Sequence, residues 1–139
     1  ASAVAALAAN AQSPGDPMTP PVMDLFATFE LASARTLPAL DASHPCSRLH
    51  GHTFTVILTM RGPVDPQYGW VMDFADVERA WAPLKAALDH VHLNAVPGLE
   101  NATTEHIALY IWERLAPALP LLHEVEVRES GRSGVRYRG

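Results

Sequence analysis

The sequence contains a single cysteine, Cys46, and little positive charge. Of its 139 residues, 10 are lysine or arginine and 15 are aspartate or glutamate, which gives a formal net charge of -5. This composition shows no basic footprint for nucleic acid, so no nucleic-acid partner is expected. One cysteine excludes an internal disulfide and leaves a free thiol whose role must be explained.

Long apolar runs are also lacking. No run approaches the length of a membrane span, so no membrane partner is expected. Residues 1–23 are rich in alanine and proline and carry no charge before Asp16. They lack the basic segment of a signal peptide, and Met18 and Met23 are both possible native starts. We therefore expect residues 1–23 to be a leader or an added extension, and residues 24–139 to be one cytoplasmic domain.

Alternation of apolar and polar residues predicts two strands, at 24–35 and 50–61. In the first strand, the buried face runs from Leu25 to Arg35. In the second, the even-numbered residues from His50 to Met60 form the apolar face, so His50 and His52 lie on it. WVMDF, residues 70–74, is predicted to be a short strand in addition to those of the main sheet.

Helical spacing predicts a helix from Asp76 to Leu88, with a kink or break at Pro83. A second helix is predicted to be capped by Thr103 or Thr104 and to end before Pro117. HEVEVRES and GVRYRG, joined through Gly131 and Gly134, are typical of a hairpin. The order strand, strand, helix, helix, strand, strand predicts an α+β fold: an antiparallel four-stranded sheet with two helices on one face.

The stretch HPCSRLHGH, residues 44–52, combines residue types that bind metals or act as bases. His50 and His52 lie two apart in a strand, so both imidazoles face one side and suit a metal ion, although two core histidines are the alternative. A catalytic zinc site needs at least three protein ligands. Cys46 is either a small buried hydrophobe or an activated loop thiol that acts as a base or nucleophile.

Asp89 and His90 are adjacent and follow the first predicted helix. Neighbouring residues bond each other as a catalytic pair only across a turn, and a histidine at a helix C-terminus is also favoured by the helix dipole.

Glu129 continues the inner face set by Val125 and Val127. A buried carboxylate needs a partner. That partner is either Arg35 or a ligand with two parallel N–H groups, such as a pterin or guanine. The alternative is that the strand ends at Arg128 and Glu129 is exposed.

Five stretches in this order resemble the 6-pyruvoyl-tetrahydropterin synthase family, most closely its bacterial branch, the 6-carboxy-tetrahydropterin synthases of queuosine biosynthesis: CSRLHGHTF, GWVMDFADV, LDHVHLN, PGLENATTE and ESGRSGVRYRG. The resemblance covers about residues 24–139. It implies a tunnelling fold (T-fold), whose protomers assemble into a barrel as a homo-oligomer, a trimer or hexamer. It also implies a small-molecule pterin substrate, 7,8-dihydroneopterin triphosphate, and the products 6-carboxy-5,6,7,8-tetrahydropterin and acetaldehyde.

The resemblance assigns roles to individual residues. The family's catalytic residues match Cys46, Asp89 and His90, with the Asp–His pair brought to the cysteine by assembly of the subunits. The residues that bind the pterin match Glu129, as its anchor, and Thr103 and Glu105, near its edge.

The zinc site of the family is only partly matched. His50 and His52 correspond to two zinc ligands, but the third ligand falls on Arg35, and a guanidinium group does not ligate zinc. The spare histidines, which no pattern places as substitutes, are His44, His92 and His106. We therefore expect zinc to be weakly bound or absent, with Arg35 contacting substrate and neutralising a developing oxyanion. The alternative is that Arg35 turns away to a carboxylate and another histidine completes the site.

Three functions remain open. The first is an active 6-carboxy-tetrahydropterin synthase-like enzyme with an altered zinc site. The second is a zinc-free pterin-binding paralogue, and the third is a non-enzymatic T-fold assembly module. The presence of Cys46, Asp89, His90 and Glu129 argues against the third.

The stretch ESGRSG also differs from the family, which often has Glu-Thr and a following cysteine at this position.

Overall fold

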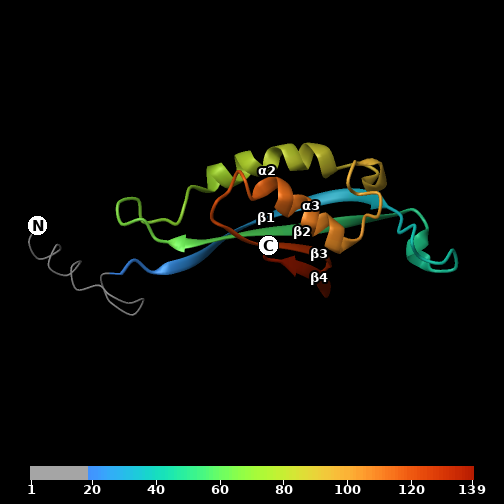
Figure 1. Ribbon diagram of the computed structural model, residues 1–139, viewed down its shortest axis with the longest axis horizontal. Helices are drawn as coiled ribbons and strands as arrows, with labels where there is room; N and C mark the ends of the chain where they lie inside the picture. Colours follow the sequence, from blue (N-terminus) through green and yellow to red (C-terminus); the bar gives the residue numbers. More distant parts are fainter. Residues whose placement is uncertain (1–18) are drawn as a thin grey trace, which may run out of the picture.

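A computed structural model describes residues 19–139, which form an antiparallel sheet with two helices on one face (Figure 1). The strands lie in the spatial order β1 (Val22–Arg35), β2 (His50–Pro63), β3 (Leu122–Ser130) and β4 (Ser133–Tyr137). The helices are α2 (Phe74–Leu88) and α3 (Thr104–Leu115), with short 3-10 turns at η1 (Pro45–Ser47) and η2 (Leu93–Ala95). The predicted α+β architecture is confirmed.

The first strand begins earlier than predicted. Val22 and Met23 belong to β1, so the end of the expected leader is part of the sheet. The rest of that leader, residues 1–18, lies outside the described residues. Within residues 19–139, no helix is long and apolar enough to cross a membrane.

The register of the sheet places the chemistry-bearing residues at one end. β1 and β2 pair along their whole length, from Val22 opposite Pro63 to Arg35 opposite His50. β3 joins β2 with Arg128 opposite Thr55, so Glu129 comes next toward the same end. The pairing of β2 with both β1 and β3 therefore brings the end of β1, the start of β2 and the end of β3 together.

The core lies between the sheet and the helices. It confirms the predicted faces, because the fully buried residues of β2 are Phe54, Val56, Leu58 and Met60. The helices supply the opposite wall with Val77, Trp81, Leu84, Leu88, Ile107, Ile111 and Leu115. Each such side chain contributes about 1.5–3 kcal/mol when it leaves water, and this packing fixes the site at the sheet's end.

One local prediction is wrong, and of the predicted kink or break at Pro83 the break is absent while the kink stays a prediction. WVMDF is not a strand, because the side chain of Asp73 accepts a hydrogen bond from the Ala75 N–H and caps α2, which begins at Phe74. The predicted break at Pro83 is also absent, since α2 continues to Leu88. Pro83 is exposed, and packing of the opposite face of α2 against the sheet outweighs the hydrogen bond that proline removes.

The predicted C-terminal hairpin is confirmed, with a tighter turn. Gly131 and Arg132 connect β3 to β4, and Gly134 lies inside β4, opposite Arg128. A Cβ atom on Gly134 would lie 2.6 Å from the Val127 carbonyl oxygen and 2.9 Å from the Arg128 Cα. Only glycine fits this close approach of two strands.

Candidate active site

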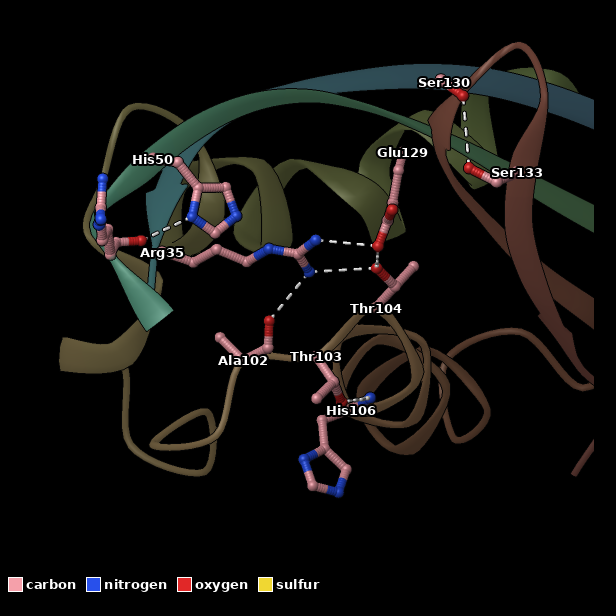
Figure 2. A network of polar contacts seen from close by, with 10 residues as sticks. Arg35, His50, Ala102, Thr103, Thr104, His106, Glu129, Ser130 and Ser133 are labelled. Atoms are coloured by element: carbon pink, nitrogen blue, oxygen red, sulfur yellow. Dashed lines mark hydrogen bonds and ion pairs between the residues drawn. The ribbon is translucent and has the colours of Figure 1, made fainter. Parts of the chain in front are cut away.

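Arg35 is the centre of a buried polar network at the end of β1. It is only 2% exposed. Its Nη1 donates to the Ala102 carbonyl at 3.0 Å and to Thr104 Oγ1 at 3.1 Å, and its Nη2 donates to Glu129 Oε1 at 2.9 Å. Figure 2 shows the side chain extending from the strand end beside His50 to Glu129 and Thr104. The guanidinium carbon lies 5.0 Å from the centre of the Phe54 ring, within range of a cation–π contact.

Glu129 forms the other half of this ion pair. Its Oε1 accepts from Thr104 as well as from Arg35, while no described residue donates to Oε2. The Thr104 hydroxyl lowers the pKa of Glu129, burial raises it, and Arg35 lowers it again, so the pKa lies below its ordinary value. Side-chain exposure is 3% for Arg35 and 37% for Glu129, so the carboxylate keeps access to a ligand.

Of the two partners expected for Glu129, the structure shows Arg35, and a ligand at the same carboxylate stays a prediction. Arg35 takes the carboxylate, and the threonine in the network is Thr104. Thr103 instead caps α3, its side chain accepting from the His106 N–H, and Glu105 is exposed in the first turn. Thr104 lies on the buried face of α3 with Ile107 and Ile111.

His50 and His52 face each other with ring centroids 4.8 Å apart. His50 Nδ1 lies 2.7 Å from the Arg48 carbonyl oxygen, which only accepts, so Nδ1 is the donor, and in the neutral ring Nε2 carries the lone pair. That Nε2 atom is buried without a hydrogen-bond partner. Burial lowers the pKa of His52, and the positive charge of Arg35 and the neighbouring His50 lower it further.

A three-ligand zinc site does not fit these residues. Among residues 19–139, no three histidine, cysteine or acidic side chains are grouped to hold a metal ion. Two of the spare histidines are engaged by their side chains: His44 Nδ1 accepts from the Cys46 N–H, and His106 Nδ1 bonds the Asn101 carbonyl. His92 is exposed and pairs with Ala34 through its backbone. Zinc would have His50 and His52 alone, one ligand fewer than a catalytic site needs.

Asp89 and His90 bond each other, which a turn at His90 makes possible. His90 has φ of 56°. Its Nδ1 lies 2.8 Å from Asp89 Oδ2, while Asp89 Oδ1 accepts from the Ala32 N–H at 2.9 Å. The pKa of Asp89 is lowered first by the Ala32 hydrogen bond and then by the one with His90. The pair is thus anchored to the edge of β1, with the His90 side chain 79% exposed.

Cys46 lies apart from that pair. It is a half-buried free cysteine in η1, and its carbonyl accepts from the Leu37 N–H at 2.9 Å. Within the described part of the chain, its thiol makes no hydrogen bond to Asp89 or His90. One protomer therefore joins Arg35, Thr104 and Glu129, but does not join the three catalytic candidates.

The fold agrees with that of known proteins. Residues 24–139 match the family model described as 6-pyruvoyl tetrahydropterin synthase, so the chain belongs to this family. The solved structure of the Caenorhabditis elegans 6-pyruvoyl tetrahydropterin synthase superposes with a TM-score of 0.79 at 23% identity, covering 87% of this chain and 98% of that one. This likeness confirms the predicted T-fold topology of the protomer.

Two curated relatives differ in how much of their length is matched. The chain is 38% identical over 119 residues to the 6-carboxy-5,6,7,8-tetrahydropterin synthase of Synechocystis sp., which is 81% of this chain and 91% of that protein. It is also 38% identical over 96 residues to the human 6-pyruvoyl tetrahydrobiopterin synthase, which is 65% of this chain and 66% of that protein. The match therefore spans slightly less than two thirds of the human protein.

The unequal burial of Arg35 and Glu129 predicts unequal costs of mutation. Glu129→Ala leaves a buried guanidinium without its counter-charge and should lower the free energy of unfolding by about 3 kcal/mol. Arg35→Met leaves a partly solvated carboxylate and should cost about 1–2 kcal/mol. Urea unfolding at equal protein concentration measures both. A larger loss for Arg35→Met would contradict this description of the pair.

Proposed function

We propose that this chain is a 6-carboxy-tetrahydropterin synthase-like enzyme that converts 7,8-dihydroneopterin triphosphate to 6-carboxy-5,6,7,8-tetrahydropterin and acetaldehyde, in queuosine (7-deazaguanine) biosynthesis. The observation that carries the proposal is the partly open carboxylate of Glu129, whose pKa is lowered and whose Oε2 has no described donor. The choice of this reaction within the family is supported by the match across 91% of the Synechocystis synthase.

Glu129 is the proposed pterin anchor. The amino-pyrimidine edge of a pterin offers two parallel N–H groups, which an ionised carboxylate accepts in a bidentate pair. Oε2 is ready for one of them. Oε1 already accepts from Arg35 and Thr104, which fill its two lone-pair sites. The second N–H therefore displaces one of these donors, and the Thr104 hydroxyl can rotate away at lower cost than the buried Arg35.

Arg35 and His50 are proposed to hold the substrate's side-chain hydroxyl groups at the strand end where the family places zinc. The two residues are directly opposite each other in the β1–β2 register. Arg35 Nε and His50 Nε2 are both buried without a partner, one an N–H donor and the other a lone-pair acceptor. A hydroxyl group accepts from the first and donates to the second. The fixed charge of Arg35 would also stabilise an oxyanion that develops there.

Cys46 is proposed as the base, with the Asp89–His90 pair as its proton-transfer partner from a neighbouring subunit of a homotrimer or hexamer. The thiol is engaged by no described residue, and the His90 side chain is 79% exposed at the edge of β1. Both features suit a site completed by assembly. The Asp89 carboxylate orients the His90 ring, since it holds Nδ1 at 2.8 Å and leaves Nε2 for the proton.

The ion pair also favours a second candidate function, a zinc-free pterin-binding paralogue without this activity. Arg35 already uses the carboxylate that anchors the pterin. If that pair does not yield to the substrate's second N–H, the chain binds a pterin through Oε2 alone and positions it too loosely for catalysis.

Turnover of 7,8-dihydroneopterin triphosphate separates the two candidates. We expect the purified chain to form 6-carboxy-5,6,7,8-tetrahydropterin and acetaldehyde, detected by mass spectrometry. Cys46→Ala should slow product formation by about 10²–10⁴-fold, the usual contribution of a general base, and leave biopterin binding unchanged in calorimetry. Biopterin binding with unchanged substrate would instead establish the paralogue. A Cys46→Ala rate within a few-fold of the original would show that the thiol is structural.

We also propose that Arg35 keeps the zinc content of the site low. Two histidines and a nearby fixed positive charge should keep zinc clearly below one per subunit in the unmutated protein. Arg35→His supplies a third imidazole at the strand end and should raise zinc content toward one, measured by elemental analysis of untagged protein after dialysis.

Arg35→Met is the matched control, because it removes the same charge without adding a ligand. Its zinc content should remain low. Stoichiometric zinc in the unmutated protein would show that another residue completes the site and would defeat this prediction.

A further inference from the structure

The outer face of the C-terminal hairpin, opposite the helices, carries a basic hollow. Its volume is about 520 Å³, within the size range of small-ligand sites. Four arginines line it, Arg128, Arg132, Arg136 and Arg138, together with Glu126. Side chains two apart in a strand share a face, so Glu126 and Arg128 lie on the face opposite Glu129. The hollow and the candidate active site are therefore on opposite faces of the sheet.

Glu126 arranges two of these arginines as a pair. Its two oxygens accept from the Nε atoms of Arg128 and Arg136, one oxygen each. The carboxylate side chain is only 7% exposed, whereas those of Arg128 and Arg136 are 42% and 58% exposed. Burial raises the pKa of Glu126, but the hydrogen bonds from both arginines outweigh it, so the pKa lies below its ordinary value. Because Glu126 binds each guanidinium group at Nε, the terminal Nη groups stay available to a ligand.

The hollow exists because Gly134 is opposite Arg128 in the β3–β4 register. Any side chain at Gly134 would push into this space, since even its Cβ would lie 3.1 Å from Arg128 Cγ. Glycine thus serves two purposes at this position. It permits close approach of the strands and leaves room between the arginines.

The charge of the hollow is not balanced internally. Glu126 is shared by two arginines, Arg138 pairs with Glu124 at 2.8 Å, and Arg132 makes no ion pair within the described residues. Two positive charges remain on a chain whose formal net charge is -5. A ladder of cross-strand ion pairs would explain Arg136 and Arg138 as sheet-stabilising contacts, but it explains neither Arg132 nor the surplus charge.

We propose that this hollow is a binding site for a di- or triphosphate group, distinct from the pterin site. Guanidinium forks bind phosphate oxygens in bidentate pairs, and the Glu126-held arginines present two such forks on one rigid hairpin. Arg132, on the two-residue turn, also lines the hollow. A triphosphate occurs both free and as part of a nucleotide, and the same arginines would recognise either.

The test is calorimetric titration of the full chain with sodium tripolyphosphate, ATP and adenosine in low-salt, phosphate-free buffer. We expect tripolyphosphate to bind, and Arg132→Gln to weaken it by about tenfold or more while the melting temperature stays unchanged, because Arg132 is exposed and unpaired. Equal binding of ATP, with none of adenosine, would place recognition on the phosphates of either source. Binding of tripolyphosphate without ATP would identify a free polyphosphate.

The matched control is Arg61→Gln. Arg61 is an exposed arginine on β2 that pairs with Asp24 and does not line the hollow. This variant removes the same charge from the protein and should leave tripolyphosphate affinity unchanged. Equal weakening by both variants would reduce the effect to overall charge and overturn the proposal. So would the absence of tripolyphosphate binding at about 1 mM, the weakest affinity compatible with a dedicated site.

Discussion

The buried ion pair between Arg35 and Glu129 links four parts of the chain. Arg35 is the last residue of β1, and its guanidinium group lies over the ring of Phe54 in β2. Thr104 is the first residue of α3, and Glu129 lies near the end of β3. A guanidinium group that is 2% exposed must satisfy its charge within the protein. The contact therefore ties the start of α3 to the ends of β1 and β3, in addition to the apolar packing that holds α3 against the sheet.

The arginine at position 35 accounts for the departure from a three-ligand zinc site, because a guanidinium group does not ligate zinc. The side chain at the third ligand position is committed to a carboxylate, so His50 and His52 keep a site that is incomplete for zinc. The orphaned atoms Arg35 Nε and His50 Nε2 then become the polar groups with unmet bonding capacity at the strand end. A substrate hydroxyl that satisfies both offsets part of the cost of burying them.

The fold was largely predictable because its signals are local. Two-residue alternation in β2 identified Phe54, Val56, Leu58 and Met60 as the buried face, and each is fully buried. The failures have equally local causes. The apolar run before Phe74 was mistaken for a strand because Asp73 caps a helix there, and Pro83 is tolerated because packing maintains α2.

The site was predictable in its residues but less so in its contacts. Alternation placed Glu129 on the inner face, and Arg35 was one of its two expected partners. Thr104 was missed because a threonine pair at a helix start does not reveal which hydroxyl caps the helix and which turns inward. The bond between Asp89 and His90 depends on a left-handed backbone at His90, which no sequence pattern indicates. No bond within the described part of one chain joins Cys46 to that pair, so their meeting across subunits remains a proposal.

The coupling energy between Arg35 and Glu129 tests the account most directly. A double-mutant cycle with Arg35→Met, Glu129→Gln and the double variant, measured by urea unfolding at one protein concentration, isolates that energy from the separate effects of each change. We predict a coupling energy of about 2 kcal/mol, because each single variant leaves one charge without its partner, whereas the double variant leaves none. A coupling near zero would contradict the claim that this ion pair organises the site.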